Sequence, residues 1–181
     1  MSYKLDAWLQ EVDEISAAVQ HLFAGVADEM LNRQPAPGRW SVAQNLHHLV
    51  IFNESYFPIL RQVNGGTYVP PFAAKLPLLP KYLGQTLLRG VQPDARRRMK
   101  TFPRWEPQGP EFHRDAMSRF LSHQDLLKQI MRESADTINR GTIIESPLSR
   151  AIVYPLATAF EIIVAHEKRH IRQAEDALKS L

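Results

Sequence analysis

The chain has 181 residues, of which 44% are hydrophobic and 23% are charged, and its formal net charge is +3 at pH 7. This composition is ordinary for a globular protein, the length suits a single domain over residues 1–181, and no apolar run is long enough to span a membrane. The lack of cysteine excludes disulfides, cysteine-ligated zinc and a protein thiol nucleophile. Because the first residues carry no apolar signal core, we expect a cytoplasmic protein.

Two helices are predicted in the first third of the chain. Apolar residues recur about every 3.6 positions over residues 5–31, which is typical of a helix with one buried face. A segment with proline and glycine ends this helix. The spacing of Ser41 and Gln44 fits a capping box, so we predict a second helix over residues 41–63, kinked at Pro58.

The middle of the chain, residues 64–110, has a different composition. It holds eight of the thirteen prolines and five of the eight glycines. A loop of this length without secondary structure would be unusual in a compact domain. We therefore expect a crossover that wraps the bundle and covers a pocket, with short helical pieces over residues 74–79 and 81–88.

The densest group of positive charges lies within this middle segment, over residues 96–100. Basic runs of this kind contact phosphates in nucleic-acid-binding proteins, but those proteins usually add interleaved aromatic side chains. One short run without aromatic residues favours a solvated loop. We therefore expect no nucleic-acid partner.

Two further helices are predicted in the last third of the chain. The third helix spans residues 111–139, and the fourth follows Pro155 and runs to Leu178, with a capping box at Thr158 and Glu161. Strands have little support, because the only β-prone stretches, residues 142–144 and 151–153, are short. Four long helices with one long connection predict an all-α fold, a four-helix bundle with a Pro/Gly-rich crossover between the second and third helices.

His166 and His170 are the first candidates for a functional site. Their i, i+4 spacing places both imidazoles on one helix face, together with apolar residues of the inward stripe. Each could be a core histidine that is hydrogen-bonded to a neighbour. However, protonating two stacked imidazoles in an apolar interior would bring like charges together, and a shared divalent metal removes that problem. Metal binding by this pair is therefore a hypothesis of the same weight as two ordinary hydrogen-bonded core histidines.

Glu167 lies between these histidines and completes a His-Glu-x-x-His string, which zinc peptidases use with the glutamate as general base. Few residues follow His170, so no later helix would carry a further ligand, and we do not favour a peptidase. Glu167 lies about 100° round the helix from His166. We expect it either on the surface or at the mouth of the site.

A third metal ligand must come from another helix. The spacing of the remaining histidines does not choose among them, although the adjacent pair on the second helix can offer only one imidazole to a given partner. The candidates are His21, His47, His48, His113 and His123.

Two segments resemble the signatures of the DinB/YfiT-like superfamily of four-helix metalloproteins. The first is Gly38-Arg39-Trp40-Ser41 with a His-Leu pair eight residues after the tryptophan, which His48 matches. The second is the closing His-x-x-x-His helix, which His166 and His170 match. The position four residues before His48 is often acidic in this family and is Gln44 here.

The resemblance implies a divalent metal site, with nickel or zinc as the cofactor, held by His48, His166 and His170. It also implies a small-molecule substrate and a homodimer. Because the family includes bacillithiol and mycothiol transferases, the function that it implies is a metal-dependent low-molecular-weight thiol S-transferase. A metal-dependent hydrolase and a non-catalytic, stress-associated metal-binding protein are the alternatives.

A metal-bound water or thiolate would be the reacting group in either enzyme, with Gln44 and Glu167 as candidate helpers. Gln44 lies one turn before His48 and could orient its imidazole, although its capping role is the favoured interpretation. Asn53 and Glu54 could hold a metal-bound water, but a buried Asn53 and a solvated Glu54 are favoured.

Overall fold

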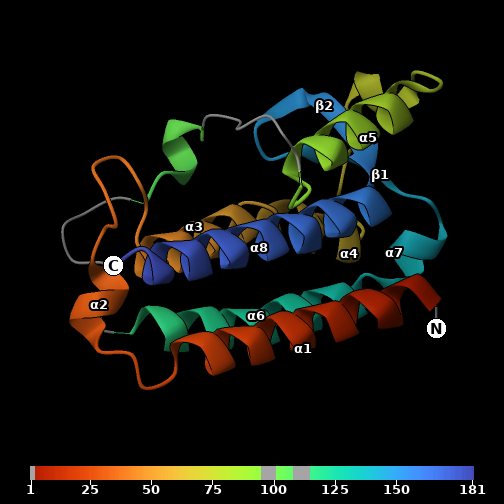
Figure 1. Cartoon of the computed structure of the whole chain (residues 1–181). Helices are drawn as coiled ribbons and strands as arrows, with labels where there is room; N and C mark the ends of the chain where they lie inside the picture. Colours follow the sequence, from red (N-terminus) through yellow and green to blue (C-terminus); the bar gives the residue numbers. More distant parts are fainter. Residues whose placement is uncertain (1–2, 95–100, 108–114) are drawn as a thin grey trace.

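The computed structural model describes residues 3–94, 101–107 and 115–181. It is mostly helical, which confirms the predicted all-α fold class (Figure 1). The basic run over residues 96–100 lies outside the described residues. Within the described part, the elements in chain order are α1 (Tyr3–Phe23), α2 (Asp28–Asn32), α3 (Val42–Glu54), α4 (Phe57–Asn64), η1 (Phe72–Lys75), α5 (Leu79–Val91), η2 (Pro103–Trp105), α6 (Ala116–Glu133), α7 (Ala135–Asn139), β1 (Ile143–Ser146), β2 (Ser149–Pro155) and α8 (Leu156–Lys179).

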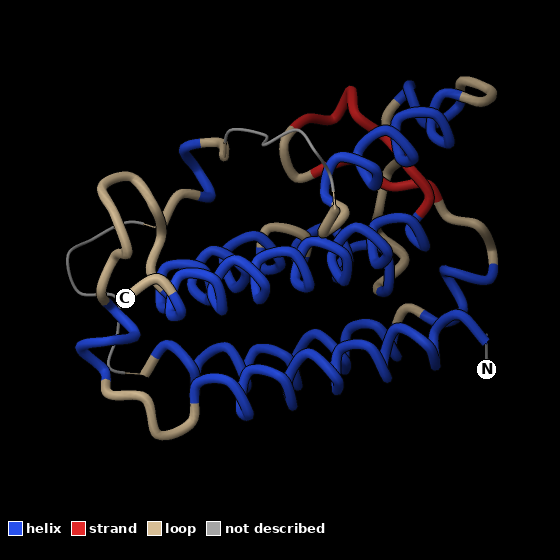
Figure 2. The backbone as a smooth tube through the Cα atoms, in the orientation of Figure 1, coloured by secondary structure: helices blue, strands red, loops and turns tan. Residues whose placement is uncertain are grey.

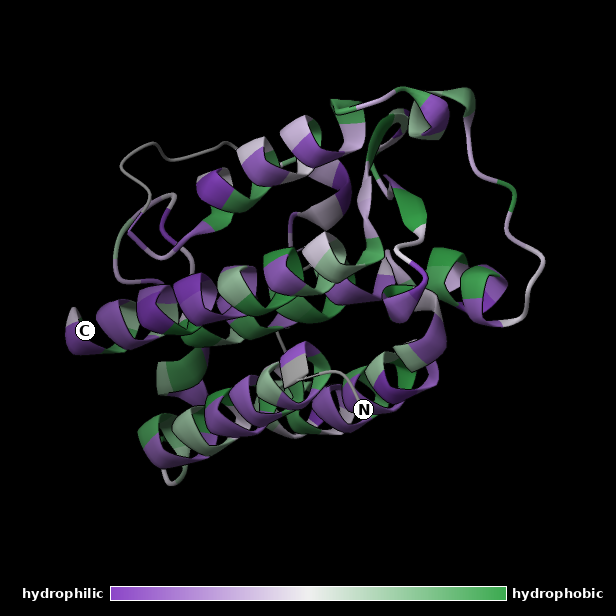
Figure 3. Cartoon of the chain, turned by 90° about the vertical axis from the view of Figure 1, so that its right-hand side faces the viewer, coloured by the Kyte–Doolittle hydropathy of each residue, from purple (hydrophilic) through white to green (hydrophobic). Residues whose placement is uncertain are grey.

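Four long helices form the bundle in two layers, with α1 beside α6 and α3 beside α8 (Figures 1 and 2). Helix α5 and the two strands lie on the other side of the α3–α8 layer. The long helices carry hydrophobic and hydrophilic faces, as Figure 3 shows. Their apolar faces meet in a common core that includes Val12, Leu49, Phe120 and Ile163, all fully buried. None of the described helices is long and apolar enough to cross a membrane.

The first predicted helix is wrong in its extent, because α1 ends at Phe23 and a separate short helix, α2, follows. Gly25 lies between them with a φ of 78°, in the left-handed region that glycine adopts without a steric penalty. The apolar pattern continues through this turn, since Val26 and Leu31 still pack on the core. Periodicity alone therefore does not reveal the break.

The start of the second predicted helix is confirmed and its continuity is not. The Ser41 hydroxyl accepts from the Gln44 amide at 3.1 Å, and Gln44 Oε1 accepts from the Ser41 amide at 2.9 Å, as a capping box requires. Helix α3 then ends at Glu54, four residues before Pro58. A proline ring clashes with the carbonyl four residues earlier, so Pro58 lies in the first turn of the new helix α4 instead of kinking the old one.

The third predicted helix corresponds to α6 and α7, which are separated at Ser134. Residues 111–114 of that prediction lie outside the described part of the chain. The fourth predicted helix is α8, but its predicted capping box is wrong. Helix α8 starts at Leu156, directly after Pro155, so Thr158 already lies inside the helix and caps nothing.

The short β-prone stretches form an antiparallel hairpin, which the sequence had given little support. Ile144 pairs with Tyr154 across β1 and β2. Both side chains are fully buried, and the Tyr154 hydroxyl lies 2.9 Å from the Tyr56 hydroxyl on the turn between α3 and α4. These contacts with the bundle stabilise the hairpin. They cannot be predicted from the β-propensity of the local sequence.

The middle segment contains more regular structure than its composition suggests. Helix α5 confirms the predicted helical piece over residues 81–88, whereas the piece predicted over residues 74–79 is replaced by the 3-10 turn η1. A Cβ atom added to Gly84 would lie 2.9 Å from Tyr154 Cβ and 3.0 Å from Thr158 Cγ2. The glycine thus allows α5 to lie directly against β2 and the first turn of α8, which positions the C-terminal end of α5 beside the histidines.

Candidate metal centre

Three histidines from two helices meet between α3 and α8. His48 comes from α3, and His166 and His170 come from successive turns of α8. Their ring centroids lie 4.5–5.0 Å apart, and one nitrogen from each ring lies within 4.8 Å of the others. All three residues are buried, with 2%, 8% and 7% of their surface exposed. We call this group the histidine cluster.

His48 is oriented by a backbone carbonyl of the middle segment. Its Nδ1 lies 2.7 Å from the carbonyl oxygen of Trp105, and because a carbonyl only accepts, Nδ1 must carry the proton and donate. In the neutral ring Nε2 then holds the free electron pair. This Nε2 faces His166 Nε2 at 3.3 Å, so the unprotonated edge of His48 points into the cluster.

His170 is oriented in the same way by a side chain. Its Nδ1 lies 2.9 Å from Asn45 Oδ1, and the Asn45 amide nitrogen donates to the Ser41 carbonyl at 2.9 Å. That second bond fixes which end of the Asn45 amide faces the histidine, so His170 Nδ1 donates and Nε2 keeps the electron pair. His166 instead packs against Phe52, with ring centroids 4.1 Å apart. Two of the three rings are therefore held in the tautomer that metal ligation requires.

Burial keeps these imidazoles neutral. It lowers the pKa of His48 to about 4, although the hydrogen bond to Trp105 acts in the opposite direction. Burial also lowers the pKa of His166 and of His170 well below the usual value, and each is lowered further by the charge of neighbouring histidines and of Arg169. Neutral imidazoles with free electron pairs are the form in which histidine binds metals.

The histidine cluster lines a cavity of about 390 Å³. Aromatic side chains form much of its wall, with Trp40 stacked on His170 at 5.8 Å and tilted against His48 at 4.9 Å between ring centroids. Phe52, Phe102 and Trp105 also line it. A cavity of this size, in which aromatic side chains and polar groups converge, is typical of small-molecule sites.

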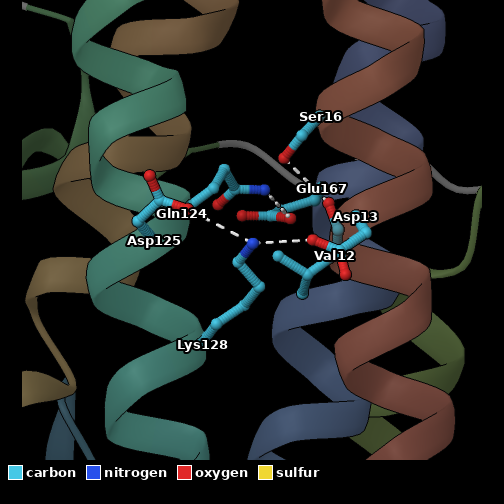
Figure 4. Close-up of polar contacts among 7 residues, drawn as sticks. All are labelled: Val12, Asp13, Ser16, Gln124, Asp125, Lys128 and Glu167. Atoms are coloured by element: carbon cyan, nitrogen blue, oxygen red, sulfur yellow. Dashed lines mark hydrogen bonds and ion pairs between the residues drawn. The ribbon is translucent and has the colours of Figure 1, made fainter.

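Glu167 is neither a surface residue nor a neighbour of the cavity mouth, so both expectations for it are wrong. It is fully buried in the bundle, where its two carboxylate oxygens accept from Asn53 Nδ2 at 2.7 Å and Gln124 Nε2 at 2.9 Å. Figure 4 shows its side chain pointing toward Gln124 of α6. Burial raises its pKa to about 7. We call Asn53, Gln124 and Glu167 the carboxyl cluster.

The other candidates fall in different places. The side-chain oxygen of Gln44 is used in the capping box and also accepts from Gln34 at 2.9 Å, which supports the capping interpretation. His123 is buried but stacks on Phe57, outside the histidine cluster. His21 is exposed, and His47 is half-buried on α3 outside the cluster, whereas His113 lies outside the described residues. As expected, Asn53 is buried and Glu54 is exposed.

Three features of the site were not identified from the sequence. Asn45 lies three residues before His48, a spacing that places both on one helix face, so this contributor was detectable. The Trp105 contact is made by a backbone carbonyl 57 residues from His48, and such a contact leaves no sequence signal. Arg169 lines the cavity between the two α8 histidines, and nothing in its sequence position distinguishes it from a surface charge.

The donor set fits a divalent cation of intermediate softness. Three imidazole nitrogens without a cysteine or an acidic ligand suit zinc, nickel or a similar ion, and leave further coordination positions to a small molecule. The buried hydrogen bonds of His48 and His170 are the contacts that usually orient metal-binding imidazoles. The group is therefore compatible with metal binding.

Comparison with known proteins gives one result. No curated protein and no solved structure gives a significant match to the chain. A comparison with protein families, by contrast, matches residues 11–174, a range that contains all three histidines of the cluster, the whole of α3 and most of α8. The chain belongs to the DinB superfamily.

Proposed function

We propose that this protein is a metal-dependent enzyme in which His48, His166 and His170 hold nickel or zinc, and that it transfers a low-molecular-weight thiol to a small electrophile. The observation that supports this best is the convergence of three neutral imidazoles, two of them anchored through Nδ1, in the wall of a cavity of about 390 Å³. When bound there, such a cation would act as a Lewis acid that lowers the pKa of a thiol or a water molecule.

The chain's own residues would bind and orient the reactants. Trp105 and Asn45 hold two imidazoles in the correct tautomer, so the site needs little reorganisation when a cation enters. The aromatic side chains in the cavity wall would provide apolar contact for the body of a substrate. Since the chain has no cysteine, the thiol must come from a small molecule.

A hydrolase would use the same site but would need a general base. In the peptidase-like string that base would be Glu167, and its carboxylate is engaged with Asn53 and Gln124 inside the bundle, away from the cavity lining. We therefore rank hydrolysis second. A non-catalytic metal-binding role ranks third, because the histidines line a cavity large enough for a small molecule instead of being packed on all sides.

The proposal is tested with protein purified without a histidine tag and reconstituted with zinc or nickel. A panel of small thiols is mixed with 1-chloro-2,4-dinitrobenzene, in which a C–S bond forms, chloride leaves and the thiol proton passes to the solvent. We expect a metal-dependent rate above the uncatalysed reaction for at least one thiol. Acceleration of ester hydrolysis without thioether formation would favour the hydrolase, and full metal binding without either activity would favour the non-catalytic role.

We also propose that the protein is cytoplasmic and forms a homodimer. The support for a dimer is a group of exposed apolar side chains on the middle segment, including Val69, Phe72, Leu78 and Tyr82, which are 68–80% exposed. Light scattering after size-exclusion chromatography measures the mass directly. A monomer at micromolar concentration would refute the dimer without affecting the metal proposal.

A further inference from the structure

Arg169 is a cation in the wall of the cavity that pairs with no acidic side chain among the described residues. It lies on α8 between His166 and His170 and is half-buried. Its Nη1 donates to the Gly90 carbonyl at 2.7 Å, which uses one of the five N–H donors of the guanidinium group. Among the ion pairs of the described residues, none involves Arg169.

The charge of Arg169 is unfavourable for a metal centre unless something compensates for it. A guanidinium group stays protonated at any physiological pH, and its field already disfavours positive charge on His166 and His170. A divalent cation held by three neutral imidazoles would bring two more positive charges to the same cavity. Glu106 and Asp176 also line the cavity, but neither forms an ion pair with Arg169.

The wall of the cavity also holds a hydrogen-bond donor that no described residue satisfies. Trp105 lines the cavity, and its indole Nε1 is buried with no partner among the described residues. Buried polar groups nearly always find a partner, so this donor and the Arg169 cation in one cavity wall favour a ligand that carries acceptor oxygens. The flat guanidinium fork matches the two oxygens of a carboxylate especially well.

We propose that the cavity binds a small thiol that carries a carboxylate, with the carboxylate paired to Arg169 and the sulfur directed to the histidine cluster. This assignment rests on the proposed metal-dependent thiol chemistry and names the class of thiol that the site selects. The negative charges of the ligand compensate for both Arg169 and the bound cation. A thiol of the same size without the carboxylate compensates for only one of them.

The test measures binding by calorimetry to the zinc-loaded protein, with 3-mercaptopropionate and its uncharged analogue 3-mercaptopropionamide as matched probes. We expect the acid to bind at least about 10-fold more tightly than the amide, as a charge-assisted, two-pronged hydrogen bond provides. Arg169→Gln should weaken the acid about 10- to 100-fold and change the amide by less than about 3-fold. Arg169→Lys should fall between these values, because it keeps the charge and loses the fork.

Arg172→Gln is the matched control, since Arg172 is exposed on the same helix and does not line the cavity. This substitution removes the same charge as Arg169→Gln. It should leave the preference for the acid unchanged. Equal affinity for acid and amide in the unmodified protein would overturn the inference. If that protein still binds zinc stoichiometrically, the proposed metal site is unaffected by this result. Failure of the unmodified protein to retain zinc would refute both proposals. The two-probe comparison on the unmodified protein needs no variant, so equal affinity for the two probes overturns the inference even if Arg169→Gln misfolds.

Discussion

Helices α3 and α8 contribute to both the histidine cluster and the carboxyl cluster, yet the two clusters differ in their surroundings. Helix α3 contributes His48 to one and Asn53 to the other, and α8 contributes His166 and Glu167, which are adjacent in sequence. The histidines line a cavity, whereas Glu167 is sealed between helices and bonded to two neutral amides. The angular position of a residue around α8, about 100° per step, therefore decides whether it can meet a ligand.

Burial acts on both clusters and has opposite consequences. In the histidine cluster it lowers the pKa of each imidazole, which leaves the electron pairs free for a ligand. In the carboxyl cluster it raises the pKa of Glu167 to about 7, so the carboxylate is ionised only at a cost. Desolvation keeps the imidazoles of the histidine cluster in the neutral form that can bind a metal, whereas in the carboxyl cluster it only lowers stability.

The largest difference between the clusters should appear on removal of a metal ligand. We expect His48→Ala and His170→Ala each to lower metal affinity by more than about 100-fold, beyond the effect usual for residues that only orient a ligand. Helicity by circular dichroism should stay close to that of the unmodified protein, because the core packing is provided by other residues. Metal content by mass spectrometry after dialysis of untagged protein measures the loss.

His123→Ala is the control for those variants, since His123 is equally buried but lies outside the histidine cluster. It should retain stoichiometric metal. If His48→Ala retained all of its metal and His123→Ala lost it, the third ligand would be His123 on α6. The comparison between the histidine cluster and the carboxyl cluster would then have no basis.

The sequence predicts the long helices well because their apolar faces recur with helical spacing, but it does not locate their interruptions. Gly25 and Pro58 could each lie within one continuous helix or end it. The contacts of the surrounding fold decide between these alternatives, and here both positions lie at breaks between helices. Spacing within one helix predicts that His166 and His170 lie together. The participation of His48 is predicted only by family resemblance, since contacts between distant helices leave no periodic trace.

Glu167 illustrates the second limit of sequence analysis. A charged residue between two inward-facing residues is usually expected at the surface, and α8 would allow this if it were packed on one side only. In the structure α8 contacts α1, α3 and α5, and the face that carries Glu167 is covered, so that Glu167 is fully buried. The compensating partners are amides on α3 and α6, and neither carries a charge that would have suggested a pairing.

The next effect concerns stability and separates the carboxyl cluster from the histidines. The pKa of Glu167 is raised on folding from 4.5 to about 7, so its contribution to stability is full below pH 4.5 and is lost as pH rises toward 7. Glu167→Gln removes the titration and can still pair with both amides, because a glutamine offers both a donor and an acceptor. We expect the variant to be more stable by up to about 3 kcal/mol at pH 8, with little difference at pH 4.

Urea unfolding in the presence of a chelator, at pH values from 4 to 8, measures this difference. The histidine titrations are common to both proteins and cancel in the comparison. Glu133→Gln is the control, because Glu133 is exposed and its replacement should leave the pH profile unchanged. Loss of stoichiometric metal in Glu167→Gln would contradict the separation of the two clusters.

A smaller effect is expected for Asn45, whose side-chain oxygen lies within hydrogen-bond distance of His170 Nδ1. Asn45→Ala removes the acceptor for His170 Nδ1 and should weaken metal binding by about 10- to 100-fold. Asn45→Asp keeps that acceptor and should restore most of the affinity, even though it loses the bond to the Ser41 carbonyl. Competition titrations with a metal-binding dye measure both variants. Equal weakening by the two substitutions would mean that Asn45 supports the fold and does not orient the imidazole.

The smallest effect concerns Lys128, which Figure 4 shows near the carboxyl cluster with its charge directed to other residues. Its Nζ lies 2.6 Å from Asp13 and 3.2 Å from Asp125, and both of these carboxylates are largely exposed. Because solvent screens such pairs, Lys128→Met should destabilise the protein by less than about 1 kcal/mol, and salt should reduce the effect further. The pH-dependent difference in stability between the unmodified protein and Glu167→Gln should be the same with and without the Lys128→Met substitution. If the substitution changed that difference, the charge of Lys128 would be stabilising the ionised Glu167. The carboxyl cluster would then not be electrostatically independent of the charges on the protein surface.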